Sequence, residues 1–266
     1  MIRKLRCAAA RISTLLSVNY AYMLEYRVEI YLWALSNTLP FILMGVWVHA
    51  ARQGDFPMNP AQMASYFLVV FIVRNYTSVW VVWDFEYHVV EGKLSPLLLQ
   101  PLDPAWRFVA AHAGEKLART PFVAAIIALV LLLYPESRWT PTIAHVLLAA
   151  TAIVAAFVLR FCIQYTSAML AFHVERASAI EELMFLPLIF LSGLIAPLSL
   201  YPEPVRAAAM WTPFPYVLHF PVQLLLGRTE HAVQGFAIIA AWSATFFLLN
   251  RLLWRLGLRC YSAMGA

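Results

Sequence analysis

The sequence predicts an all-α integral membrane protein with one transmembrane domain over residues 1–266. Hydrophobic residues make up 62% of the chain and charged residues only 12%, and the mean hydropathy is +0.72. A soluble domain carries about 25% charged residues. Long apolar runs recur along the chain, and most approach the roughly 20 residues that a helix needs to cross a bilayer. Together these observations predict six transmembrane helices.

The apolar runs give the six spans in chain order. The third run is short, and the fourth is long enough to tilt or to project into the cytosol. No internal repeat or low-complexity linker divides the series, so a single domain is expected. The expected spans cover about residues 30–50, 62–83, 117–134, 142–172, 183–200 and 233–254.

The segment before the first span has the periodicity of an amphipathic helix. Its apolar residues follow a 3,4,3,4 spacing, and its basic residues lie mostly off that seam. Such a helix is expected to lie in the headgroup region. A signal peptide is disfavoured, because no small-residue cleavage site follows a short apolar core. The seam is formed by Ile2, Leu5, Ala9, Ile12 and Leu16.

Basic residues are unevenly distributed between the segments that connect the spans. With both termini in the cytosol, 13 of the 19 lysine and arginine residues fall in cytosolic segments and four in outer segments. Cytoplasmic loops carry an excess of basic residues. The bias predicts cytoplasmic termini and a cytoplasmic loop from Asp84 to Lys116. The cytosolic set is Arg3, Lys4, Arg6, Arg11, Arg27, Lys93, Arg107, Lys116, Arg119, Arg176, Arg251, Arg255 and Arg259.

The segment from Phe190 to Pro221 is apolar yet rich in helix breakers. Seven of the 16 prolines lie between Pro187 and Pro221. Proline interrupts the helical hydrogen-bond ladder, and irregular backbone is not tolerated against lipid. We therefore expect broken, re-entrant helices at the outer surface before the last span, where transport proteins place gates. The expected gate residues are Ser192, Gly193, Pro197, Pro213 and Pro215.

Arg74 and Arg160 fall within the expected spans, and Glu181 and Glu182 begin the fifth. Charges inside a membrane are costly and usually face a bundle interior or a cavity. Arg74 lies in the middle of the second span and is interpreted as lining a pathway or gate. For Arg160 a structural ion pair or snorkelling to the interface is slightly favoured. The roles of Arg160, Glu181 and Glu182 stay open.

A short apolar segment, Val89–Leu102, lies in the long cytosolic loop. Its leucines at i, i+3 and i+4 share one face if the segment is helical, and an exposed apolar face needs a partner. We interpret it as a coupling helix that fills a groove on an ATPase subunit. The alternatives are packing on the protein's own spans or lying against the inner leaflet. The expected coupling residues are Glu91, Gly92, Leu94, Leu97, Leu98 and Pro101.

Two histidine–glutamate pairs, His88/Glu91 and His112/Glu115, have i,i+3 spacing. A metal site is conceivable there, but no further ligand set accompanies the pairs, so solvated polar residues near the headgroups are favoured. A membrane-embedded lipid-modifying enzyme that uses these four residues is the alternative function. The patterns HExxH and GxSxG are absent, and no catalytic or metal-binding residue is expected.

The chain also lacks a phosphate-binding loop of its own. The only Gly-Lys is Gly92-Lys93, and Tyr87 stands where the Walker A pattern needs its first glycine. ATP and Mg²⁺ are therefore expected on another chain, and no cofactor on this one. The scattered basic residues match no nucleic-acid-binding module. The three cysteines form no CxxC pair and are interpreted as inert thiols.

Three stretches resemble the permease subunits of ABC-2 type exporters, in particular the bacterial permeases that occur as paired genes. Glu25-Tyr26-Arg27 is similar to the family's YR sequence before the first span. Residues 91–102, EGKLSPLLLQPL, resemble its G-x-L-x-x-L-L-x-x-P-L loop. The sequence Ser192-Gly193, Pro197 and the later Pro213 and Pro215 resemble its fifth-span signature and extracellular re-entrant helices, although Ala196 replaces the aromatic residue common before Pro197.

The resemblance implies six spans, an N-terminal interface helix, a coupling helix between spans two and three, and two permease copies or paralogues around a central pathway. It also implies a separate ABC ATPase subunit with a Walker A motif. The expected function is therefore export across a bacterial inner membrane, driven by ATP hydrolysis on that subunit. A scaffold without transport is a further alternative. The substrate, the choice between homodimer and heterodimer, and export against import stay open.

Overall fold

The computed structural model describes residues 2–25, 28, 32, 33, 35, 37–54 and 57–261, with the backbone alone for residues 2–12. These residues form helices and no strand, as the sequence predicts. The longer elements are α1 (Ile2–Glu25), α3 (Leu39–Gln53), α4 (Pro60–Thr77), α5 (Val81–Val90), α6 (Leu94–Leu98), α7 (Pro104–Leu133), α8 (Ile143–Ala168), α9 (Ser178–Leu191), α10 (Glu203–Met210), α11 (Phe214–Val217), α12 (His219–Leu225) and α13 (Ala232–Cys260). Three short 3₁₀ turns are η1 (Pro135–Ser137), η2 (Met169–Phe172) and η3 (Leu198–Leu200).

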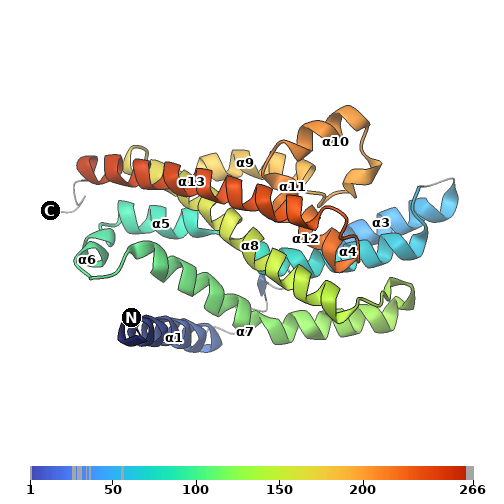
Figure 1. Cartoon of the computed structure of the whole chain (residues 1–266), viewed down its shortest axis with the longest axis horizontal. Helices are drawn as coiled ribbons and strands as arrows, with labels where there is room; N and C mark the ends of the chain where they lie inside the picture. Colours follow the sequence, from blue (N-terminus) through green and yellow to red (C-terminus); the bar gives the residue numbers. More distant parts are fainter. Residues whose placement is uncertain are drawn as a thin grey trace.

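The helices form an elongated bundle with α8 and α13 running along its length (Figure 1). Helix α4 lies inside the bundle and buries most of its side chains between α3, α8 and α12. Helix α1 lies alongside the first half of α7, where the backbone of Tyr20 approaches Gly114. The helix expected before the first span is therefore present, although its apolar seam falls largely in residues whose side chains are not described.

Four stretches of the described chain are long and apolar enough to cross a membrane. They are Pro60–Val90, Pro104–Leu133, Ile143–Phe172 and Ala232–Cys260, which match the second, third, fourth and sixth expected spans. Helices α3 and α9, in the first and fifth, have 15 and 14 residues. Part of the first expected span and Tyr26-Arg27 lie outside the described residues. Six membrane crossings therefore stay a prediction.

Helix α7 extends beyond the third expected span at its N-terminal end. Helix α7 begins at Pro104, because Asp103 caps it by accepting a hydrogen bond from the Ala105 amide over 2.9 Å. Lys116 and Arg119, assigned from the sequence to a cytosolic segment, lie inside α7 and are buried. They therefore cannot be counted as loop charges when the orientation of the chain is judged.

The second and fifth spans also differ from a single uninterrupted helix. The second is broken at Ser78–Trp80, between α4 and α5. The fifth helix begins earlier than expected, at Ser178, and ends at Leu191 rather than near residue 200. Between Leu191 and α13 the chain forms only short helices, so the expected disruption is confirmed while its placement relative to a membrane stays a prediction.

Two glycines let α13 pack closely on the bundle. A Cβ atom at Gly235 would lie 2.0 Å from the Phe220 ring, and one at Gly257 would lie 2.1 Å from the Phe172 ring. Each aromatic ring therefore occupies the space of an absent side chain on α13. The start of α1, the end of α13 and α6 lie toward one end of the bundle, and the end of α3, the start of α4 and η1 lie toward the other (Figure 1).

Candidate functional site

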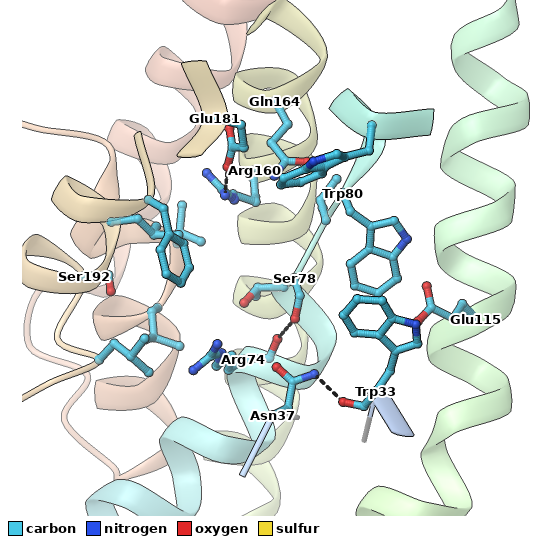
Figure 2. Close-up of a pocket in the computed structure, with 18 of the residues that line it drawn as sticks. Trp33, Asn37, Arg74, Ser78, Trp80, Glu115, Arg160, Gln164, Glu181 and Ser192 are labelled. Atoms are coloured by element: carbon cyan, nitrogen blue, oxygen red, sulfur yellow. Dashed lines mark hydrogen bonds and ion pairs between the residues drawn. The ribbon is translucent and has the colours of Figure 1, made fainter. Parts of the chain in front are cut away.

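A cavity of about 810 Å³ lies beside the break between α4 and α5. Arg74 and Asn37 lie at one end and Arg160 and Glu181 at the other, and Ser192, which follows α9, also lines the cavity (Figure 2). Two of the residues singled out from the sequence as pathway or gate residues, Arg74 and Ser192, are thus brought into one site from helices more than 100 residues apart.

Arg74 enters the cavity from a helix that is otherwise almost wholly buried. Its Nη1 atom is buried and has no hydrogen-bond partner, and no carboxylate in the described part of the chain pairs with it. The nearby Ser192 hydroxyl is also buried without a partner there. A charge in a membrane protein that faces a cavity in this way marks a candidate functional site.

At the other end of the cavity Arg160 forms a buried ion pair with Glu181. The Gln164 amide donates to the same carboxylate oxygen of Glu181 over 2.8 Å. This pair joins α8 to α9, which answers the question left open for Arg160 and Glu181 in favour of a structural ion pair. Glu182 lines the cavity and is exposed.

Tryptophan rings form one wall of the cavity. Trp33 stacks on Trp80 with ring centroids 5.9 Å apart and an angle of 14° between the planes (Figure 2). Trp83 and Phe185 also line the cavity. The site therefore combines an unpaired cation with a broad aromatic surface.

Side chains of α7 hold the break between α4 and α5. The Lys116 ammonium donates to the Ser78 carbonyl over 2.7 Å and lies 4.8 Å from the centre of the Phe157 ring. The Trp80 amide donates to Nε2 of His112 over 3.1 Å. A cation is favourable at the C-terminal end of a helix, where carbonyl groups lack partners. Lys116 therefore stabilises the end of α4, and His112 accepts from the backbone just before α5.

The turn after α9 is tied to two other helices. The Tyr66 hydroxyl donates to the Gly193 carbonyl over 2.6 Å, and the Trp47 indole donates to the Ile195 carbonyl over 2.7 Å. Gly193 has φ of +85°, a conformation that favours glycine. Pro197 then precedes η3, and the chain from Ser192 to Pro197 is not helical. Pro213 and Pro215 lie apart from this turn, at α11.

We expect Gly193→Ala to destabilise the protein by about 1–3 kcal/mol, because alanine would adopt a left-handed backbone conformation there. Its Cβ would also lie 2.8 Å from the Tyr66 hydroxyl oxygen. A denaturant titration of the detergent-purified protein measures the effect. Gly45→Ala is the matched control, since a Cβ there has no atom within 4 Å. Equal stability of the two variants would contradict a strained, closely packed turn at Gly193.

His219 lies beside the same turn, with Nδ1 3.4 Å from where a Gly193 Cβ would be. Burial, and repulsion from Arg228 to a lesser degree, lower the pKa of His219 to about 4. The imidazole is therefore neutral between pH 5 and 8, and the turn gains no charge from it in that range.

Helix α6 forms where the coupling helix was expected, and Gly92 precedes it with φ of +68°. Leu94 and Leu97 are buried against Phe85, Val89 and the aromatic residues of α7 and η2. The three leucines of the expected face therefore differ, because Leu94 and Leu97 face the bundle and Leu98 is exposed. The outward surface of α6 and the residues beside it consists of Glu91, Lys93, Pro96, Leu98, Leu99, Gln100 and Pro101.

The two histidine–glutamate pairs are not brought together as a metal site. His112 is engaged with the Trp80 amide, and Glu115 pairs with Arg119. Nδ1 of His88 contacts the Asp84 carbonyl at 2.7 Å. Among the residues that the structure describes, no group of three histidine, cysteine or acidic side chains has metal-site geometry. These contacts give the residues structural roles.

Long apolar helices around a charged internal cavity define a multi-pass membrane protein. Residues 21–265 match the model of a family described as "ABC-2 family transporter protein". The chain therefore belongs to the ABC-2 transporter family, and the resemblance in the sequence is confirmed. None of the curated proteins compared with the chain matches it.

Proposed function

We propose that the chain is the permease subunit of an ATP-driven exporter in a bacterial inner membrane. Membership of the ABC-2 family supports a transmembrane permease that works with an ABC ATPase. In this proposal ATP and Mg²⁺ bind the separate ATPase subunit, and a second permease copy or a paralogue completes the pathway. The chain itself performs no covalent chemistry and contributes binding, gating and coupling.

The observation that carries the proposal is the continuity between α6 and the cavity. Helix α5 begins at the cavity wall, where Trp80 and Asp84 line the space, and leads within a few residues to α6. Leu94 and Leu97 attach α6 firmly to the bundle, while Leu98 and Leu99 are 36% and 88% exposed. A push on α6 by a closing ATPase would therefore reach the cavity through α5 and switch the pathway between inward-facing and outward-facing states.

The Ser192–Pro197 turn serves as the outer gate in this proposal. It lies next to the cavity, and its hydrogen bonds to Tyr66 and Trp47 connect it to α4 and α3. Movement of α9 relative to these helices would open or close the space around Ser192. Arg74 then lies between the gate and the coupling segment, on the route of the cargo.

The orientation that we propose places both termini and α6 in the cytosol. The start of α1, the end of α13 and α6 lie at one end of the bundle, which supports this orientation (Figure 1). We expect a cysteine at Lys93 to resist a membrane-impermeant maleimide in intact cells and one at Glu203 to react, in a background without native cysteines. Reaction at position 93 and protection at position 203 would reverse the orientation.

The direct test of the function is recovery of the motor. The tagged chain, purified from its native membranes in mild detergent, should bring down a polypeptide with a Walker A motif. The complex should hydrolyse ATP, and replacement of the lysine in that Walker A motif should abolish hydrolysis. A purified chain that brings down no ATPase under conditions where the permease stays folded would contradict the proposal.

A further inference from the structure

Arg74 differs from the paired arginines of the described chain. Arg52, Arg119, Arg160, Arg206 and Arg251 each form an ion pair with a carboxylate. Arg74 forms none, although the cavity that it lines also contains carboxylates. Its Nη1 atom remains buried without a partner in the described part of the chain. A guanidinium without a counter-ion raises the free energy of the folded protein in such surroundings. An anion from outside the chain would lower it, so Arg74 is a candidate anion-binding group.

The groups around Arg74 extend that site. Asn37, Ser78 and Ser192 line the same cavity, and the Ser192 hydroxyl is wholly buried without a partner among the described residues. Hydroxyl and amide groups donate hydrogen bonds to phosphate or carboxylate oxygens alongside an arginine. The Ser78 hydroxyl already donates to the Arg74 carbonyl, and the Asn37 amide donates one hydrogen to the Trp33 carbonyl. The guanidinium therefore supplies the charge, and Ser192 and the second amide hydrogen of Asn37 supply further donors.

The rest of the cavity suits an apolar group. The stacked Trp33 and Trp80 rings form one wall, and Phe185 and Leu188 also line the space. Ligand sites commonly combine apolar and aromatic walls with a few polar groups that fix orientation. The combination at Arg74 therefore fits an amphiphile better than a free inorganic ion.

The carboxylates of the cavity limit the charge of that amphiphile. Asp84 and Glu182 line it, and neither has an ion-pair partner among the described residues. Asp84 lies beyond the helix break from Arg74, and Glu182 adjoins the Arg160–Glu181 pair at the far end. A second negative charge that reached them would be repelled.

We propose that the cavity binds an amphiphile with a single anionic group, a carboxylate or a phosphate diester, which pairs with Arg74 while its apolar part lies against Trp33 and Trp80. That this molecule is cargo rests on the proposed function. A bilayer lipid and a free amphiphile share this chemistry, and the experiment separates them.

The test uses the full-length permease alone in phosphatidylcholine nanodiscs. Laurate is the anionic probe and dodecyltrimethylammonium the cationic probe, with binding followed by tryptophan fluorescence. We expect laurate to bind at least tenfold more tightly than the cation, since removing one charge-assisted hydrogen bond from a site weakens binding by about that factor or more. Arg74→Gln should abolish the preference. Arg138→Gln, which removes an exposed arginine outside the cavity, should preserve it.

A second measurement identifies the source. Organic extracts of wild-type and Arg74→Gln protein from membranes are compared by mass spectrometry. Anionic lipid retained by the wild type alone assigns the site to a bilayer lipid, whereas no retained lipid together with laurate binding assigns it to a free amphiphile. Equal affinity for the two probes, or unchanged laurate binding in Arg74→Gln, would overturn the proposal. Because the ATPase takes no part, such a failure leaves the proposed coupling untouched, and failure to recover an ATPase leaves this site untouched.

Discussion

Replacing Arg160 by methionine is expected to lower the free energy of unfolding by about 3–5 kcal/mol, because it leaves a buried carboxylate without its cation. Glu181 is 1% exposed and would retain only the Gln164 amide as a hydrogen-bond donor. A denaturant titration of the protein in detergent micelles measures the change. This loss of stability should be among the largest that a single substitution of a buried residue causes in this chain.

Two controls separate the ion pair from a general effect of losing arginine. Arg206→Met breaks an exposed pair with Glu203 and should cost about 0–1 kcal/mol. The double variant Arg160→Met with Glu181→Gln removes both buried charges and should recover most of the stability. If Arg160→Met is as stable as Arg206→Met, the Arg160–Glu181 pair does not hold α8 to α9.

Aspartate at Leu98 and Leu99 together is expected to weaken binding of the ATPase subunit at least tenfold, while the permease still folds and inserts. Both side chains lie on the outward surface of α6, and apolar anchors at an interface commonly contribute this much. Co-purification of the ATPase and ATP hydrolysis by the complex give the measurement. Trp211→Asp, an exposed apolar site after α10, is the matched control and should retain the ATPase.

Leu97→Asp should behave differently from the outward pair. Leu97 is 8% exposed and packs in the cluster around Phe85, so a charge there should reduce the yield of folded permease. Equal ATPase recovery in wild type and the Leu98/Leu99 double variant would assign the exposed leucines to the lipid surface. The coupling role of α6 would then be wrong.

Much of the fold follows from local patterns. The apolar runs predict the long helices, and the glycine and proline content after Leu191 predicts the end of α9. The start of α7 was missed although a signal existed, since Asp103-Pro104 is a good helix beginning. The charge pattern alone places Lys116 and Arg119 in a cytosolic segment, whereas Arg119 lies one turn from Glu115 and pairs with it inside the helix.

The break at Ser78–Trp80 had no signal in its own sequence, since no proline or glycine lies there. It depends on Lys116 and His112, which are more than 30 residues away along the chain. Arg74 and Ser192 likewise line one cavity from distant parts of the chain. Local periodicity put Leu94, Leu97 and Leu98 on one face, but only the packed structure separates the two anchoring leucines from the exposed one.

In the proposed mechanism, the break in the second span is the pivot. A continuous helix would transmit a tilt at α6 along its whole length and disturb the buried packing of α4. Because the backbone ladder is interrupted at Ser78–Trp80, α5 and α6 can tilt relative to α4 together with the α8 and η2 residues on which they pack. The break lies at the cavity wall, so in the proposed mechanism a small rotation driven by the ATPase would change the shape of the space around Arg74.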